Sequence, residues 1–197
     1  DNKDRVIQGQ RDTPPVDGNQ DKLYETARQL VGEERPIDAV YTSDLRRAKD
    51  HARLIADFLR ARYSDLYPGH TIDYFENDLL RERARGPLEG AKCVVNDTGL
   101  TITLEEGKAV ALPDGQTTQV LRLPQFQSVD EYLWSLDDPM LGEDRAAIAE
   151  RIGMFKDRYL KIYERSGGKV LIMGHSHWIN PARNLLVDGD VASRPFE

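Results

Sequence analysis

The sequence predicts an α/β protein built around a mostly parallel sheet. Helix-like and strand-like patterns alternate along the chain. Residues 170–173 form a run of four apolar residues, which is typical of a strand buried in a parallel sheet. Gly174 and His175 follow that strand at once, and ligands of open α/β sheets bind beyond the carboxyl ends of the strands. His175 is therefore the first candidate functional residue, with a buried imidazole bonded to a carbonyl as the alternative.

The bulk composition fits one globular domain spanning residues 1–197, because that length suffices for one core plus an insertion. Hydrophobic residues make up 39% of the chain and charged residues 31%. The net charge of −7 argues against a nucleic-acid partner, and no apolar run has the length of a membrane span. Cys93 is the single cysteine, so no internal disulfide can form. We therefore expect a cytoplasmic protein without nucleic-acid or membrane partners.

The first elements follow from local patterns. Residues 1–20 are polar and rich in glycine and proline, which predicts a loop. Apolar residues recur at helical spacing over 22–31, and Gly32 and Pro36 end that helix. Residues 37–41 are then expected as a strand.

Ser43 and Asp44 are suited to cap a long helix that runs to about Arg62, with one apolar face. A further strand is expected over 71–75. Glycine and proline in residues 77–90 interrupt regular structure, so this arginine-rich segment is expected as a loop.

An insertion with β-hairpins is expected between the core elements, over about 91–140. Strands at 101–104 and 110–112 flank a turn around Glu106 and Gly107, and a strand at 120–123 follows the turn signal at 114–115. Beyond them, we expect a short helix over 128–136 and a long one over 144–164. Pro181 favours a last helix that starts with Asn180 as its cap rather than directly after His175.

Arginines mark the candidate chemistry. Planar guanidinium groups bind phosphate oxygens, and a helix N-terminus also favours an anion. The arginines in question lie in the opening loop, at the start of the long helix and around Glu82: Arg5, Arg46, Arg47, Arg81, Arg83 and Arg85. Each one alone fits a surface ion pair. Together with Glu82 and the histidine at a strand end, they indicate phosphoryl chemistry.

Other chemistries lack support in the sequence. His175 and His177 form an His-x-His pair without a third ligand at a suitable offset, so no metal or other cofactor is expected. Cys93 has no histidine signature of a cysteine nucleophile. Neither a Gly-x-Ser-x-Gly elbow nor a glycine-rich phosphate loop is present.

Four blocks of the chain, in order, resemble the histidine phosphatase superfamily in its phosphoglycerate mutase-like branch. They are residues 2–14, residues 41–48 with Ser-Asp-Leu-Arg-Arg-Ala, residues 80–90 with Leu-Arg-Glu and Leu-Glu-Gly, and residues 170–175. The resemblance implies a three-layer α/β/α sandwich of the phosphoglycerate mutase-like fold. It also implies a phosphatase that hydrolyses phosphomonoesters through a phosphohistidine intermediate.

The resemblance assigns roles to matching positions. Arg47 and His175 would bind the phosphoryl group, and Glu82 would act as acid and base. The substrate-binding residues expected from the matching blocks are Asn2, Arg5, Gln8, Gly9, Arg83, Glu89 and Ser176. Asn2 would contact the phosphate, and Glu89 is an alternative carboxylate. Arg83 and Arg85 lie at positions that the family does not fix, and we expect them to favour substrates with additional negative charge. The expected partner is a small phosphorylated substrate.

The chain also departs from the family pattern. The nucleophilic histidine belongs to an Arg-His-Gly motif, which we expect upstream of residue 1 together with a central strand. His51 and the pair Ser176 and His177 stand where threonine and glycine are usual. A phosphoglycerate mutase-type phosphotransferase with the insertion as a lid is one alternative. A non-catalytic module that binds phosphorylated ligands or a protein partner is another. The oligomeric state stays open, with a homodimer as one option.

Overall fold

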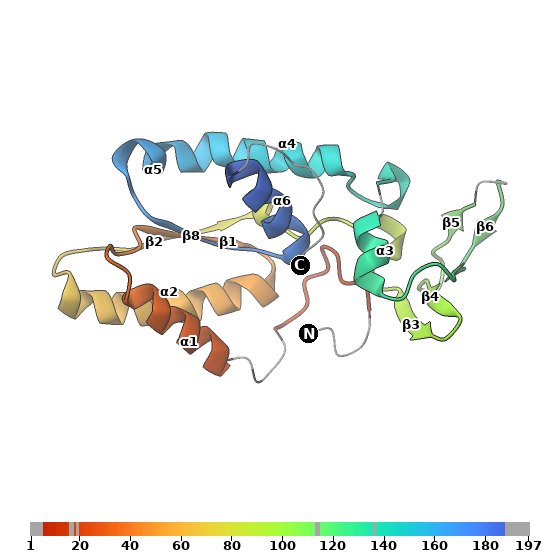
Figure 1. The fold of residues 1–197 in the computed structure, drawn as a ribbon, viewed down its shortest axis with the longest axis horizontal. Helices are drawn as coiled ribbons and strands as arrows, with labels where there is room; N and C mark the ends of the chain where they lie inside the picture. Colours follow the sequence, from red (N-terminus) through yellow and green to blue (C-terminus); the bar gives the residue numbers. More distant parts are fainter. Residues whose placement is uncertain (1–5, 16–17, 19, 113–114, 136, 188–197) are drawn as a thin grey trace.

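Helices cover both faces of a three-stranded parallel sheet (Figure 1). The computed structural model describes residues 6–15, 18, 20–112, 115–135 and 137–187. Strand β1 (Ala39–Ser43) lies between β2 (Asp73–Asn77) and β8 (Val170–Met173), and it runs parallel to both. The three-layer α/β/α class predicted from the sequence is therefore confirmed.

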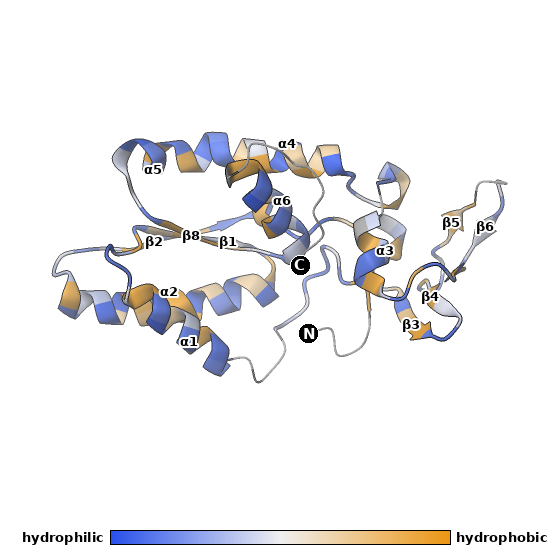
Figure 2. Cartoon of the chain, viewed as in Figure 1, coloured by the Kyte–Doolittle hydropathy of each residue, from blue (hydrophilic) through white to orange (hydrophobic). Residues whose placement is uncertain are grey.

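Helices α1 (Gln20–Val31) and α2 (Arg46–Leu66) form the layer on one face of the sheet (Figure 1). Both helices are apolar on the side that faces the sheet and polar on the other (Figure 2). The buried apolar side chains of α2 recur at helical spacing and include Ala52, Ile55, Leu59 and Tyr63. The expected long helix is therefore present, and it extends to Leu66.

The opposite layer consists of α6 (Ser176–Val187) and one long helical rod (Figure 1). The rod contains α4 (Arg145–Phe155), a π-helical segment η4 (Lys156–Leu160) and α5 (Lys161–Ser166). The Asp144 carboxylate caps α4 by accepting from the Ala147 N–H at 2.8 Å. Within the described ranges, no helix is long and apolar enough to cross a lipid bilayer.

A second, antiparallel sheet lies beside the sandwich, with strand order β3-β4-β7. Its strands are β3 (Lys92–Asn96), β4 (Gly99–Thr103) and β7 (Val120–Leu123), and a small pair, β5 (Val110–Ala111) and β6 (Thr117–Thr118), extends from it. The short helix α3 (Val129–Ser135) and the 3-10 turns η1 (Asp78–Leu80), η2 (Gly86–Leu88) and η3 (Pro139–Leu141) connect this region to the sandwich.

The predicted hairpin across Glu106 and Gly107 is wrong, because β4 pairs with β3 and β7 and not with β5. A tight turn joins β3 to β4, in which the Asn96 side chain accepts from the Thr98 N–H at 3.0 Å. Gly99 follows with a φ of +104°, which a residue with a side chain rarely adopts. The turn therefore closes β3 onto β4 before the chain reaches Glu106.

The expected cap of α2 is also wrong. Asp44 does not cap the helix, because its carboxylate accepts hydrogen bonds from Nε and Nη2 of Arg81. The bond from Nε is 2.7 Å long. Asp12 takes over the role, since its Oδ1 accepts from the Arg46 N–H at 2.6 Å. A residue of the opening loop thus satisfies the helix N-terminus.

The last helix starts earlier than predicted. The carbonyl of His175 already accepts from the N–H groups of Trp178 and Ile179, at 3.0 and 2.7 Å, so α6 begins at Ser176. Pro181 therefore lies inside the helix, where it cannot donate to the carbonyl of His177. Direct entry from β8 places the N-terminus of α6 immediately beside His175, with consequences for the site below.

Strand β8 was expected to be a buried strand, yet its four residues are only half-buried. Among the described residues it pairs with β1 along one edge and with no strand along the other. An apolar strand of Val170, Leu171, Ile172 and Met173 with a free edge can accept a further parallel strand.

Candidate active site

The site lies where the strands of the parallel sheet end. His175 follows β8, Arg47 lies in the first turn of α2 beyond β1, and Glu82 follows η1 beyond β2. The parallel register brings the carboxyl ends of these strands to one edge, so the three residues converge despite their separation in sequence. The opening loop, residues 6–15, covers this edge and is fixed by a bridge between Val6 and Lys92.

One pocket collects side chains from all of these segments and from α3. Its walls come from the opening loop, the start of α2, the segment around Glu82, α3 and the first turn of α6. The residues that line it are Val6, Ile7, Gln8, Gly9, Arg47, Glu82, Arg85, Val129, Asp130, Leu133, Ser176 and His177. Of the predicted site residues, this brings together Arg47, Glu82, Gln8, Gly9 and Ser176.

The Arg47 guanidinium is fixed in place by two backbone carbonyls. Its Nη1 donates to the carbonyl of Arg11 and its Nη2 to that of Gly9, both at 2.6 Å. Burial lowers the pKa of Arg47, while the negative charges of Glu82 and two other carboxylates oppose that effect. An arginine remains protonated in either case, so Arg47 presents a positioned positive charge at the pocket.

Glu82 forms a close pair with His177. Glu82 Oε2 lies 3.5 Å from His177 Nδ1, and the two side chains are only 13% and 8% exposed. Burial alone would raise the pKa of Glu82, but the hydrogen bond and the electrostatic interaction with His177 lower it below its usual value. Glu82 Oε1 also accepts from the Arg83 N–H at 2.8 Å. The carboxylate is therefore ionised and lies in contact with His177.

His175 is buried, and it directly precedes Ser176 and His177, which line the pocket. It is 8% exposed, and its Nε2 has no hydrogen-bond partner among the described residues. Burial and then the positive charge of Arg47 lower the pKa of His175 to about 4, although Glu82 opposes them. A neutral imidazole with an unsatisfied ring nitrogen, next to the N-terminus of α6, suits contact with an anionic ligand.

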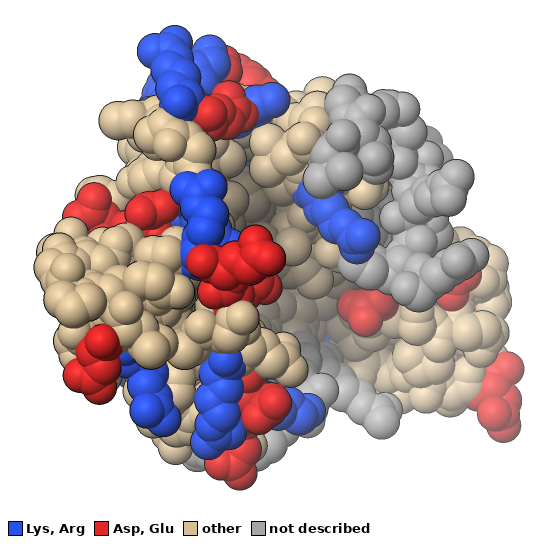
Figure 3. Space-filling model, turned by 60° about the vertical axis from the view of Figure 1, so that its left-hand side comes forward, with Lys and Arg blue, Asp and Glu red and all other residues tan. Residues whose placement is uncertain are grey.

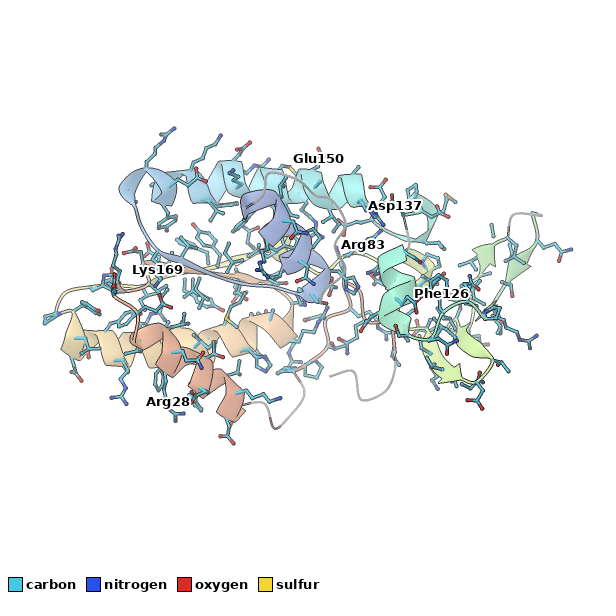
Figure 4. All side chains as sticks on the ribbon, viewed as in Figure 1. Arg28, Arg83, Phe126, Asp137, Glu150 and Lys169 are labelled. Atoms are coloured by element: carbon cyan, nitrogen blue, oxygen red, sulfur yellow. The ribbon has the colours of Figure 1, made fainter. Side chains whose placement is uncertain are left out.

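Arg83 and Arg85 face different surroundings although only one residue separates them. Arg83, which is labelled in Figure 4, is not among the residues that line the pocket, and its Nε donates to the Glu143 carbonyl at 2.5 Å. Arg85 lines the pocket and donates from Nη1 to the Leu133 carbonyl at 3.0 Å. The structure thus places Arg85 in the pocket and not Arg83, although we expected both arginines to favour substrates with additional negative charge.

Glu89 holds the loops together and does not line the pocket. Its Oε1 accepts from the N–H groups of Gln10 and Arg85, at 2.9 and 3.0 Å. Gly9 passes so close that a Cβ atom there would lie 2.3 Å from Glu89 Oε1. The predicted site residues Asn2 and Arg5 lie outside the described residues.

Three further residues around the site were not assigned a role from the sequence. Arg151 of α4 donates from Nη1 to the carbonyls of Leu79 and Arg81, at 3.0 and 2.7 Å, and from Nη2 to Glu143 at 2.9 Å. Asp12 caps α2, and His177 pairs with Glu82. Of these three residues, only His177 could have been singled out from the sequence, because it forms an His-x-His pair with His175. In the part of the chain that the structure describes, no three His, Cys, Asp or Glu side chains gather as a metal site needs.

Comparison with known proteins gives one family match and several structural ones. The family model of the histidine phosphatase superfamily (branch 1) matches residues 1–94, which confirms the resemblance over that stretch. A search of curated proteins finds no match. Three solved structures have the same fold at low sequence identity.

The first is a mycobacterial glucosyl-3-phosphoglycerate phosphatase in complex with VO3, with 20% identity, a TM-score of 0.58 and coverage of 95% of this chain and 75% of that one. The second is a phosphoglycerate mutase from Bacillus anthracis str. Sterne, with 18% identity, a TM-score of 0.60 and coverage of 95% and 74%. The third is Bacillus stearothermophilus YhfR, with 19% identity, a TM-score of 0.59 and coverage of 99% and 79%.

Proposed function

We propose, from the match of residues 1–94 to the histidine phosphatase superfamily, that this protein is a phosphatase that hydrolyses phosphomonoesters through a phosphohistidine intermediate. The observation that carries the proposal is the convergence of Arg47, Glu82 and the unsatisfied Nε2 of His175 at the carboxyl edge of one parallel sheet. These groups supply a cation, an acid–base carboxyl group and a neutral hydrogen-bonding imidazole.

In this proposal, Arg47 and His175 bind the phosphoryl oxygens. The Arg47 guanidinium is already positioned by two backbone carbonyls, so little conformational freedom is lost when phosphate binds. The N-terminus of α6 adds backbone N–H groups and a favourable electrostatic potential. Positioned donors of this kind stabilise the charge that develops on the oxygens in the transition state.

Glu82 transfers the protons. In the first step, a histidine nitrogen attacks phosphorus, the ester P–O bond breaks and the leaving oxygen takes a proton from Glu82. In the second step, Glu82 removes a proton from water, the water oxygen attacks phosphorus and the P–N bond breaks. Because the free carboxylate is ionised, Glu82 has to take up a proton before the first step.

We propose that the nucleophilic histidine lies on a further parallel strand, which pairs with the edge of β8 that no described strand covers. A parallel strand on that edge would end beside His175, as β1 ends beside Arg47. It would also complete the burial of the half-buried apolar residues of β8.

The test uses the full-length protein and p-nitrophenyl phosphate. We expect hydrolysis, together with acid-labile phosphate on a histidine when the reaction is quenched on the millisecond scale. A folded protein that releases no phosphate would contradict the proposal, and so would turnover without a phosphohistidine.

A phosphoglycerate mutase-type phosphotransferase is the second candidate. Val129, Asp130 and Leu133 of α3 form one wall of the pocket, so this region could shield a phosphorylated intermediate from water. Isomerisation of 3-phosphoglycerate that exceeds phosphate release would favour the mutase, and the reverse ratio would favour the phosphatase. The proposed setting is the cytoplasm, which the single cysteine supports, with a small phosphorylated molecule as the substrate.

A further inference from the structure

We propose that Arg151 of α4 and Glu143, which precedes that helix, are positioning residues for the proton transfer at Glu82. They hold the main chain on both sides of Glu82, so that its carboxyl group stays within reach of the leaving oxygen. This inference rests on the proposed phosphatase function and adds to it two residues that do not line the pocket.

The segment that carries Glu82 has no regular secondary structure to fix it. Residues 81–85 lie between the 3-10 turns η1 and η2 and belong to neither, so their backbone groups need partners elsewhere. A displacement of about 1 Å in a reacting group can lower a rate about a hundredfold. The proton transfer therefore depends on the contacts that hold the backbone around Glu82.

Arg151 holds the backbone before Glu82. Its Nη1 donates to the carbonyls of Leu79 and Arg81, at 3.0 and 2.7 Å, and the second carbonyl belongs to the peptide group that directly precedes Glu82. Arg151 is only 8% exposed, and burial lowers its pKa although the negative charge of Glu143 opposes that effect. Because a buried charge is costly unless it is bonded, the guanidinium has a strong reason to keep both carbonyls in place.

Glu143 holds the backbone after Glu82. Its Oε2 accepts from the Ala84 N–H at 2.7 Å, and its own N–H donates to the Ala84 carbonyl at 3.0 Å. Gly142 allows this close approach, since a Cβ atom there would overlap the Ala84 carbonyl oxygen. Glu143 Oε2 also accepts from Arg151 Nη2 at 2.9 Å, so one ion pair joins the contacts before Glu82 to those after it.

The helix that carries Arg151 is itself fixed. Ile148 and Ile152 of α4 are buried in the same apolar cluster as Leu80 of η1, two residues before Glu82. Apolar packing thus sets the distance between α4 and η1, and the bonds of Arg151 extend this order to the irregular residues that follow.

The experiment compares p-nitrophenyl phosphate with glycerol 3-phosphate as substrates of the full-length enzyme. The p-nitrophenolate ion leaves without a proton, whereas an alkoxide needs one from Glu82. We expect Arg151→Met to lower kcat/KM about ten- to a hundredfold on glycerol 3-phosphate, and less than about threefold on p-nitrophenyl phosphate. A residue needed only for stability would lower both values by the same factor.

A double-mutant cycle tests whether Arg151 acts through Glu82. In the Glu82→Gln background, Arg151→Met should lower kcat/KM on glycerol 3-phosphate by less than about twofold, because the residue that it positions no longer transfers a proton. Arg151→Lys keeps a charged donor and should retain part of the activity. Glu143→Gln should give the same pattern with a smaller loss, since its amide oxygen can still accept a hydrogen bond.

Arg60→Met serves as the matched control. Arg60 also donates to a backbone carbonyl and pairs with a carboxylate, namely those of Ile72 at 3.0 Å and Asp57 at 3.2 Å. Ile72 directly precedes β2, so these bonds lie at the opposite end of the strand from Glu82. Arg60→Met should leave the ratio of the two kcat/KM values at the parental value, whatever its effect on the melting temperature.

Equal losses on both esters in Arg151→Met would overturn the inference, and so would losses that simply add to those of Glu82→Gln. If Arg151→Met does not fold, Arg151→Lys and Glu143→Gln provide the same comparison. Failure of all three to fold would make the pair a requirement for folding and would also overturn the inference. In each of these cases the parent enzyme would still hydrolyse both esters. A parent that hydrolyses neither would instead refute the phosphatase function, and this inference with it.

Discussion

Substitution of Glu82 by glutamine separates its chemical role from its structural one. The amide has almost the same size as the carboxyl group, and its oxygen can still accept from the Arg83 N–H. Its NH₂ group would lie near His177 Nδ1, which is 3.5 Å from Glu82 Oε2. We therefore expect Glu82→Gln to fold, with a loss in the free energy of unfolding of about 1–2 kcal/mol for the weakened pair.

Turnover should fall much further than stability. General acid–base catalysis contributes about a hundredfold to ten-thousandfold, which corresponds to roughly 3–5 kcal/mol in the activation free energy. The amide can neither donate the proton to the leaving oxygen nor remove one from water. Phosphate binding depends on Arg47, His175 and the start of α6, so the inhibition constant of inorganic phosphate should change by less than about threefold.

The assay compares kcat/KM of parent and variant on p-nitrophenyl phosphate and on glycerol 3-phosphate. Because p-nitrophenolate leaves without protonation and an alkoxide does not, the loss should be larger on glycerol 3-phosphate. Equal losses on both esters would mean that Glu82 does not protonate the leaving oxygen. Unchanged turnover on both would refute the assignment and make Glu89 the next carboxylate to test.

Three more substitutions test other parts of the site. Arg47→Ala should lower kcat/KM by about a hundred- to a thousandfold and speed proteolysis of residues 6–15, because the carbonyls of Gly9 and Arg11 lose their donor. Gly9→Ala should lower the melting temperature and activity together, because its φ is +49° and the added methyl group would meet Glu89. The buried, neutral His175 destabilises the fold at low pH. Between about pH 6.5 and about pH 4 the unfolded chain binds a proton on this histidine and the folded chain does not, which lowers the free energy of unfolding by on the order of 3 kcal/mol at most. Urea unfolding at pH 7 and pH 4.5 should accordingly show a smaller loss of stability in His175→Gln than in the parent.

The sandwich could be predicted from sequence because its elements are specified locally. The helix after β1 shows its buried face at helical spacing, and the strand before His175 is a short apolar run after a pair of glycines. The same local logic failed at α6. There, the carbonyl of His175 accepts the first helical hydrogen bonds, so the helix begins at Ser176. Pro181 then lies inside the helix, which lacks the hydrogen bond that proline cannot donate.

Long-range contacts explain what the sequence could not predict. The cap of α2 comes from Asp12, which is 34 residues away from Arg46, and Asp44 is occupied by Arg81, 37 residues away. The different surroundings of Arg83 and Arg85 could not be predicted either. Both lie in one segment without regular secondary structure, so their spacing in sequence does not show which of them contacts α3. The strand pairing of the second sheet was predicted wrongly because the tight turn before Gly99 was not recognised in the sequence. That turn pairs β3 with β4.

Local charge, and not net charge, decides what this pocket can bind. The formal charge of −7 would disfavour an anionic substrate if it acted as a whole. On the face drawn in Figure 3, however, acidic and basic side chains are interspersed, so their potentials largely cancel beyond the screening length of about 8 Å. Arg47 and Arg85 line the pocket, and each has at least one hydrogen bond to a backbone carbonyl. Two positioned guanidinium groups therefore give this pocket a local positive charge although the chain as a whole is acidic.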